Sequence, residues 1–184
     1  MNAGSARAPL YRRLLGDAFE DLAAPIRRLH DLAGTMTARG VADIDRGRGI
    51  LARLVAGVVG FPAAGRDVPV EVTIASEGAA EVWTRSFAGK RFSSILGEGR
   101  GRAAHLLRES FGPVTFALAI VVKDGRLELI LRRWSFLGLT LPLWLAPRSL
   151  AFESGEDDRF HFHVEIALPL VGLIVRYRGW LLPD

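Results

Sequence analysis

The chain has 184 residues, 49% of them hydrophobic and 24% charged, which predicts one globular domain and excludes wholesale disorder. It contains no cysteine, which excludes a disulfide scaffold, a cysteine-ligated metal site and a cysteine nucleophile. The net charge is +4 and the sequence pI is about 10.3, but the arginines are scattered along the chain, so we expect no nucleic-acid binding.

The first part of the chain is predicted to be mainly helical. We expect a flexible tail at residues 1–9 and a single β-rich domain at residues 10–184. Apolar residues recur every three or four positions over residues 10–32, which predicts two short helices broken at Pro25. Residues 35–45 are predicted as a first strand, and residues 47–60 as a helix that ends at Gly60.

From Asp67 onward the pattern of apolar residues has a period of two, which predicts strands. Lys123-Asp124-Gly125 is the clearest hairpin signal in the chain. Residues 102–110 fit either a strand or a helix, and we favour a strand. The predicted strands cover residues 68–74, 81–87, 90–96, 114–122, 126–134, 149–153, 160–168 and 173–182.

The order of these elements predicts the fold class. Strands follow one another through short turns, and no strand–helix alternation is present, so a doubly wound sheet is disfavoured. We predict an α+β fold, mainly antiparallel β, with a strongly curved sheet or closed barrel of about 8–10 strands and N-terminal helices packed as a cover or lid. A barrel of this size has room for its own side chains or for one small ligand.

No targeting segment is predicted. Asp17, Glu20 and Asp21 interrupt the stretch in which a secretory signal needs an unbroken apolar core. The most apolar stretches, residues 50–61 and 136–146, are shorter than the roughly 20 residues that span a bilayer as a helix. We therefore expect a cytoplasmic protein.

Short motifs occur in a characteristic order along nearly the whole chain. They are Leu10-Tyr11, Pro25-Ile26-Arg27-Arg28-Leu29-His30, Arg46-Gly47-Arg48-Gly49, Gly60-Phe61-Pro62, Trp83-Thr84-Arg85-Ser86-Phe87, Phe111-Gly112-Pro113, Leu141-Pro142, Leu145-Ala146-Pro147, Pro169-Leu170-Val171-Gly172 and Tyr177-Arg178-Gly179-Trp180-Leu181. Together they resemble the bacterial family catalogued as domain of unknown function 4166. The resemblance implies a protein that stands alone or is attached to a reductase similar to saccharopine dehydrogenase, so a reductase is an expected partner. It implies no catalytic residues.

Trp83, Arg85 and Phe87 alternate along one predicted strand and therefore share one face. If that face lines a cavity, the rings supply apolar area and Arg85 fixes an anionic or carbonyl group of a ligand. If the face points outward, the stem of Arg85 simply covers apolar surface. Trp134, Tyr177 and Trp180 are further candidates for the same wall.

Arg46-Gly47-Arg48-Gly49 precedes a predicted helix and contains the glycine spacing of a dinucleotide fingerprint. The antiparallel strands that follow disfavour that interpretation, because the fingerprint requires a parallel crossover. Two interpretations stay open for these residues: a glycine-rich connection, which we favour, and an anion-binding helix start.

His161, His163 and Glu165 also share a strand face, with spacing that suits a metal ion. We favour a solvated face, because the alternating residues on the other side are apolar, and we predict no metal and no cofactor. The candidates for acid–base or polarising chemistry are His30, Arg85 and Tyr177.

The helix predicted at residues 50–59 has two interpretations. Its apolar face, flanked by arginines, fits a lid that packs over the barrel, which we favour, or an interfacial helix that contacts an anionic membrane surface.

Three functions remain open from the sequence. The leading hypothesis is a binding module that holds an apolar or lipid-like small molecule in a barrel cavity. The second is an accessory enzyme, such as a cyclase, an isomerase or a reductase partner, that acts on such a ligand in the same cavity. The third is a structural or interaction domain whose barrel is filled by its own side chains.

Overall fold

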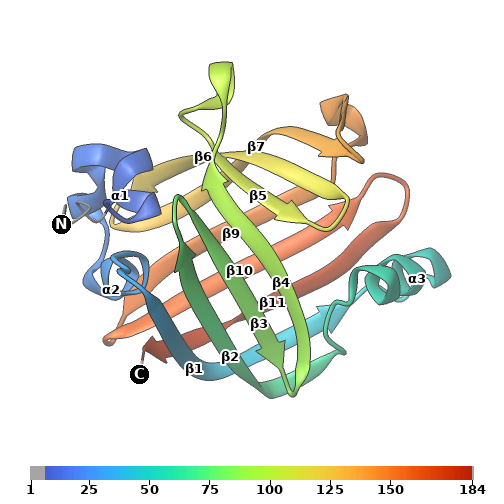
Figure 1. The fold of residues 1–184 in the computed structure, drawn as a ribbon. Helices are drawn as coiled ribbons and strands as arrows, with labels where there is room; N and C mark the ends of the chain where they lie inside the picture. The colour runs from blue at the N-terminus through green and yellow to red at the C-terminus, as the bar shows by residue number, and fades with distance from the viewer. Residues whose placement is uncertain (1–6, 184) are drawn as a thin grey trace.

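Ten antiparallel strands form a closed barrel with an extra strand at its edge, as the sequence predicts (Figure 1). The computed structural model describes residues 7–183, so most of the tail predicted at residues 1–9 lies outside the described residues. The strand order is β6-β5-β4-β3-β2-β1-β11-β10-β9-β7-β8, and a further pairing of β6 with β7 closes the ring.

The strands and helices have the following bounds. The strands are β1 (Thr35–Arg46), β2 (Gly65–Glu77), β3 (Ala80–Phe87), β4 (Lys90–Glu98), β5 (Leu107–Phe111), β6 (Val114–Lys123), β7 (Arg126–Phe136), β8 (Leu139–Leu141), β9 (Arg148–Glu156), β10 (Arg159–Leu168) and β11 (Gly172–Pro183). The α-helices are α1 (Leu10–Leu15), α2 (Ala24–His30) and α3 (Ile50–Val59). The 3₁₀ helices are η1 (Gly16–Asp21), η2 (Gly101–Ala103) and η3 (Leu143–Leu145).

The N-terminal helices close one end of the barrel, which we call the helical end. Apolar side chains of α1, η1 and α2 insert among the strands, and Phe19, Ile26 and Leu29 are completely buried. The Ala23 amide donates to the Gly125 carbonyl in the β6–β7 turn, which ties the helices to the strands. These helices form the predicted cover.

The break between the N-terminal helices differs from the prediction. It lies at residues 22–23, and Pro25 sits in the first turn of α2. A proline is tolerated there because the first-turn amides of a helix have no intrahelical acceptor.

The inward face of each strand follows from its alternation. The inward positions of β1, β2 and β3 include Ala42, Val72, Trp83 and Phe87, which are all buried. Small residues let β1 and β11 approach closely, since a Cβ atom on Gly40 would lie 1.9 Å from the carbonyl oxygen of Trp180. This side of the interior is filled by side chains.

Two segments depart from the predicted elements. The range predicted as a strand, residues 102–110, begins inside the 3₁₀ helix η2 at residues 101–103, and β5 begins only at Leu107. Strand β8 and the turn η3 had not been predicted, because an apolar run without alternation carries no signal for either.

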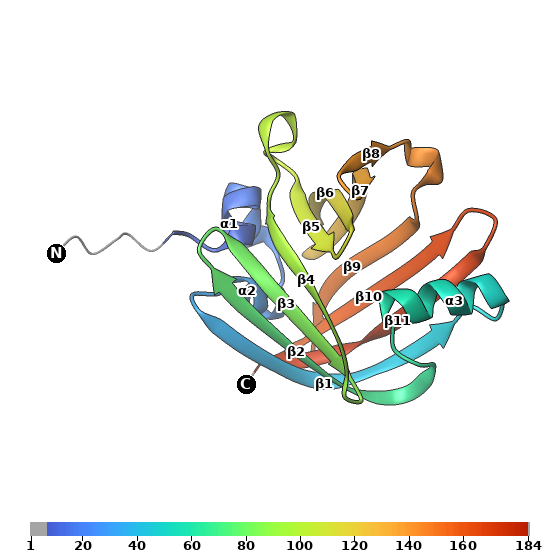
Figure 2. The ribbon, with the colours of Figure 1, turned by 45° about the vertical axis from the view of Figure 1, so that its right-hand side comes forward.

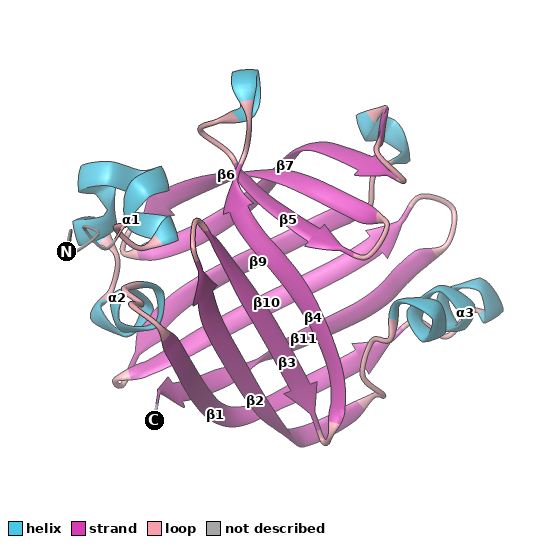
Figure 3. Cartoon of the chain, viewed as in Figure 1, coloured by secondary structure: helices cyan, strands magenta, loops and turns pink. Residues whose placement is uncertain are grey.

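The opposite end of the barrel, which we call the distal end, is where β1 leads through α3 into β2 (Figure 2). Figure 3 shows the helices gathered around the ends of the barrel. At one seam the ladder is short: β7 pairs with β9 over three residue pairs, Leu127–Leu129 against Ala151–Glu153, and its far end pairs with β8 instead.

Helix α3 does not pack as the favoured lid interpretation expects. Its buried residues are Ala52 and Ala56, whereas Ile50 and Val58 are 85% and 82% exposed. The small side chains allow close packing near β11, and this turns the large apolar side chains away from the barrel. Among the described residues, no helix has the length and hydropathy needed to cross a bilayer.

Candidate functional site

The aromatic and cationic side chains of β3 point into the barrel. Trp83 and Phe87 are 5% and 3% exposed, and the Arg85 guanidinium between them lies 5.2 Å from the Trp83 ring. Of the two orientations left open by the sequence, the structure therefore has the inward one. Tyr177 of β11 lies on the same interior, with its ring 5.4 Å from the Phe87 ring.

Polar side chains meet inside the barrel from five strands and two helices. We call them the interior polar cluster, and its members are Tyr11, His30, Glu81, Arg85, Ser94, Glu109, Glu153 and Tyr177.

One part of the cluster surrounds Arg85. Its guanidinium donates to the Ser94 hydroxyl over 2.8 Å and lies 3.4 Å from a Glu109 carboxylate oxygen. The Ser94 hydroxyl donates to the same oxygen of Glu109 over 2.8 Å. Arg85 thus already has an acidic partner, and the pair is held by three adjacent strands.

A second part of the cluster surrounds His30 of α2. Its Nε2 atom lies 2.6 Å from a Glu153 carboxylate oxygen of β9, and its ring lies 3.7 Å from the Tyr11 ring. The Nδ1 atom is buried and has no hydrogen-bond partner within the described residues. Nearby, the Trp83 indole N–H donates to Glu81 over 2.9 Å. His30 is 1% exposed, so the pair is enclosed between the helices and the strands.

The two tyrosines of the chain are both buried in this cluster. Burial raises the pKa of Tyr177 to about 12, against an opposing effect of Arg85. Burial also raises the pKa of Tyr11, and the carboxyl groups of Glu153 and Glu81 add to the effect. Neither hydroxyl has a hydrogen-bond partner within residues 7–183. Each hydroxyl is therefore available to a bound polar group.

Because the tyrosines are buried, we expect the protein to lose stability at alkaline pH. Because the native pKa of Tyr177 is about 12 and the unfolded value is 10.0, the folded state holds its phenolic proton longer than the unfolded state. The contribution of Tyr177 to the free energy of unfolding is therefore fully present below pH 10 and is lost as the pH rises through 12, a change of about 2–3 kcal/mol. We expect almost no phenolate absorbance at 295 nm at pH 10.5 in the native protein, and ionisation of both tyrosines in urea. Half-ionisation in the native protein at that pH would show that the phenols are open to water.

The charge balance of the cluster indicates which polar groups it can accept. It holds three carboxyl groups, of Glu81, Glu109 and Glu153, against the guanidinium of Arg85 and the imidazole of His30, so the carboxyl groups outnumber the basic groups. Because like charges repel strongly in a buried site, a ligand carboxylate is disfavoured there. The tyrosine hydroxyls and Arg85 can donate hydrogen bonds to a carbonyl or hydroxyl group instead.

The opposite side of the interior is apolar and only half-buried. On β6, β7 and β10, alternate residues face the buried core, and we call them the half-buried wall: Phe116, Ile120, Leu129, Leu131, Phe162 and Val164. These side chains keep part of their surface exposed to solvent. Apolar surface on this wall therefore remains to be covered.

Two further tryptophans lie apart from the cluster. Trp134 lies opposite Phe116 in the β6–β7 register, and its indole N–H donates to the Pro142 carbonyl. Trp180 was a candidate for the same wall, but it lies on the outer face, where the Arg159 guanidinium stacks on its ring at 4.3 Å. Alternation puts Trp180 outside because its neighbours Tyr177 and Leu181 are the inward residues.

The Arg46–Gly49 segment is a connection between β1 and α3. The Arg46 guanidinium donates to the carbonyls of Phe61 and Pro62, which fixes the chain after α3. A Cβ atom on Gly47 would lie 1.9 Å from the Leu173 carbonyl oxygen, so this position needs glycine. Gly49 is the N-cap of α3, and Arg48 is exposed. The flanking strands β1 and β2 are antiparallel, without the crossover of a dinucleotide site.

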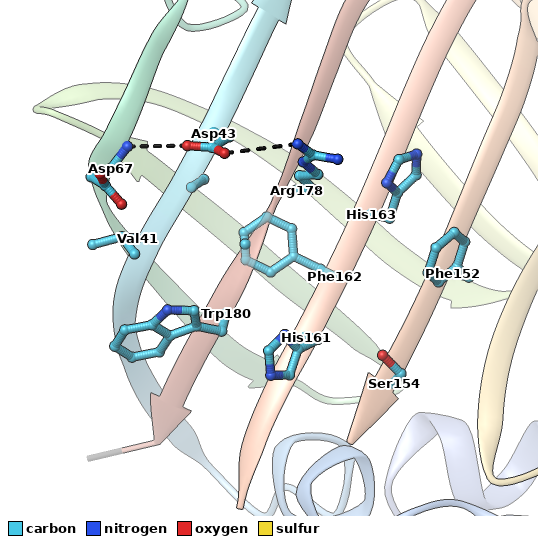
Figure 4. Close-up of a pocket in the computed structure, with 12 residues that line it drawn as sticks. Val41, Asp43, Asp67, Phe152, Ser154, His161, Phe162, His163, Arg178 and Trp180 are labelled. Carbon is cyan, nitrogen blue, oxygen red and sulfur yellow. Dashed lines mark hydrogen bonds and ion pairs between the residues drawn. The ribbon is translucent and has the colours of Figure 1, made fainter. Parts of the chain in front are cut away.

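His161 and His163 lie on the outer face of β10, beside a groove of about 380 Å³ (Figure 4). The His163 ring stacks on Phe152 at 4.8 Å, and burial lowers its pKa. Glu165 is paired with Arg176 over 2.7 Å. The described residues contain no group of three or more side chains arranged to hold a metal ion.

Several members of the interior polar cluster are not among the site residues predicted from the sequence. Glu81 alternates with Trp83 and Arg85 on one strand face, so the pattern contained a signal for it. Tyr11, Ser94 and Glu153 carry no such signal, because their place in the cluster depends on which distant elements pack together.

Comparison with known proteins gives a family and no activity. The family described as Domain of unknown function (DUF4166) matches residues 22–181 of the chain. No curated protein matches the sequence.

Proposed function

Because the chain belongs to the family described as Domain of unknown function (DUF4166), whose description names no activity, we propose from the geometry of the barrel that it binds an apolar or lipid-like small molecule. The ligand lies in the interior, its apolar part against the half-buried wall and its polar end at the interior polar cluster.

One observation carries this proposal: two tyrosine hydroxyls without hydrogen-bond partners among the described residues lie in the same interior as an apolar wall that is only half-buried. Ligand sites combine apolar walls with a few convergent polar groups. A ligand with an uncharged hydroxyl or carbonyl end satisfies both features. The excess of carboxyl groups argues against an anionic end.

The test is binding of pyrene-labelled hexadecanol and of pyrene-labelled hexadecanoic acid, followed by fluorescence. We expect the alcohol to bind at least about ten-fold more tightly than the acid, a difference of about 1.4 kcal/mol. Tighter binding of the acid would contradict the proposal that the polar end of the ligand is uncharged. Binding of neither probe would overturn the proposed function.

A pair of variants on β6 locates the site. Ile120→Trp fills the interior and is expected to lower the affinity for the alcohol at least about ten-fold, whereas Val121→Trp, its outward neighbour, leaves the affinity unchanged. Thermal melting checks that both variants fold. If Ile120→Trp does not fold, Leu129→Trp and its outward neighbour Ile130→Trp provide the same comparison on β7. Equal affinity in an inward variant and its outward control would place the ligand elsewhere.

A further inference from the structure

Large apolar side chains are exposed to solvent at the distal end of the barrel. We call them the apolar rim, and each is between 55% and 108% exposed: Ile50, Leu51, Leu54, Val58, Leu137, Leu139, Leu143, Trp144 and Leu170. Monomeric proteins scatter such residues singly over their surface, and a gathering of them marks an interaction site.

The apolar rim comes from three separate connections that the topology brings to one end. Helix α3 joins β1 to β2, the segment containing β8 and η3 joins β7 to β9, and Leu170 lies in the turn between β10 and β11. Both ribbon views show these segments on the side away from α1 and α2 (Figures 1 and 2). The rim is therefore a property of the end of the barrel and not of one helix.

The same end carries cations and no carboxylates in its connections. Residues 47–64, 88–89, 112–113, 137–147 and 169–171 contain Arg48 and Arg53 but no aspartate or glutamate. Five cations at this end, Arg48, Arg53, Lys90, Arg91 and Arg148, have no ion pair within residues 7–183. Two carboxylates stand at the adjoining ends of β1 and β2: Asp45, which is paired with Arg66 over 3.0 Å, and the exposed Asp67. Cations therefore remain in excess. The helical end differs, since its turns include Asp124, Asp157 and Asp158.

We propose that the distal end docks on an anionic lipid bilayer, with the apolar rim inserted at the level of the headgroups. Exposed apolar residues flanked by arginine and lysine are the features that hold interfacial helices on such membranes. A second copy of the chain is a poorer occupant, because a two-fold contact through this end would set its unpaired cations against one another.

Docking depends on the rim and its cations, and not on an occupied interior. Docking also has a consequence that rests on the proposed function: an apolar ligand passes between the bilayer and the barrel interior without crossing bulk water.

Vesicle sedimentation tests the docking. Vesicles of phosphatidylcholine with 30% phosphatidylglycerol are expected to bind the protein at least ten-fold more tightly than vesicles of phosphatidylcholine alone, and added salt is expected to weaken the binding. The triple variant Leu51→Gln, Leu54→Gln and Val58→Gln is expected to lose at least ten-fold in affinity. Its melting temperature should be unchanged, because these side chains are exposed. Ile95→Gln and Leu182→Gln, exposed apolar positions outside the rim, form the matched control and should bind as the wild type does.

Two further measurements separate the outcomes. The maximum of the tryptophan fluorescence emission should shift to shorter wavelength when vesicles bind, because Trp144 enters the bilayer. Trp144→Phe should remove most of this shift. Ile120→Trp should bind vesicles as the wild type does, which distinguishes failure of docking from failure of ligand binding. Equal binding to both vesicle types, or full binding by the triple variant, overturns the proposal. So does a dimer in light scattering that the triple variant dissociates, since the rim would then be a contact between copies.

Discussion

Gly40→Ala is expected to lower the free energy of unfolding by about 3 kcal/mol or more. The added Cβ atom would lie 1.9 Å from the carbonyl oxygen of Trp180 and 2.8 Å from its carbonyl carbon. Both atoms belong to the backbone of β11, which is paired with β1 from Ala38 to Arg46, so no side chain can turn aside to make room. The two strands must separate locally, and this loosens a pairing that the closed barrel requires.

The measurement is thermal melting followed by circular dichroism. For a chain of this length the expected loss corresponds to a fall of about 10 °C in the melting temperature. Gly179→Ala should behave alike, because its Cβ atom would lie 2.1 Å from the Val41 carbonyl oxygen. Gly57→Ala is the control: it lies in α3 with nothing within 4 Å, so alanine should stabilise the helix by up to about 1 kcal/mol. Melting of Gly40→Ala within about 2 °C of the wild type would contradict the close approach of β1 and β11.

Glu153→Leu is expected to lower the free energy of unfolding by about 3 kcal/mol, because it removes the one hydrogen-bond partner that a buried imidazole has among the described residues. The His30 side chain has no solvent exposure, its Nε2 atom lies 2.6 Å from Glu153, and its Nδ1 atom has no partner within the described chain. After the substitution, both ring nitrogens are buried in aromatic surroundings formed by Tyr11, Trp83 and Phe160.

A double-mutant cycle isolates the pair. His30→Phe places an aromatic ring among aromatic neighbours, so the double variant His30→Phe and Glu153→Leu replaces the polar pair with apolar groups of similar shape. We expect the double variant to be more stable than Glu153→Leu alone, since replacing both partners of a buried pair is often nearly neutral. Urea unfolding measures the four free energies. Additive losses would mean that the two side chains do not interact.

Most strands could be predicted from the sequence because alternation and turn chemistry act locally. The Asp124-Gly125 turn has positive φ at both residues, 51° and 75°, which is the conformation that such hairpin turns require. The inward set Trp83, Arg85 and Phe87 also follows from alternation once one face of β3 is known to be buried.

The interior polar cluster could not be predicted, because its members meet only after the chain has folded. His30 and Glu153 are 123 positions apart, and Arg85 of β3 meets Glu109 of β5 across the intervening strand β4. Helix α3 illustrates a second limit: its periodicity defines an apolar face, but the face that packs is the small one of Ala52 and Ala56. Periodicity identifies faces, and only tertiary packing decides which face is covered.

The pairing of the first strand with the last also governs the order in which the barrel is assembled. Strands β2 to β6 pair with their neighbours along the chain and can form as soon as each hairpin has been synthesised. In contrast, β1 pairs Ala38 with Pro183, so one edge of β1 stays open until β11 has left the ribosome. Contacts between such distant residues make closure slow, and a nascent chain with that edge exposed is the species most prone to aggregate.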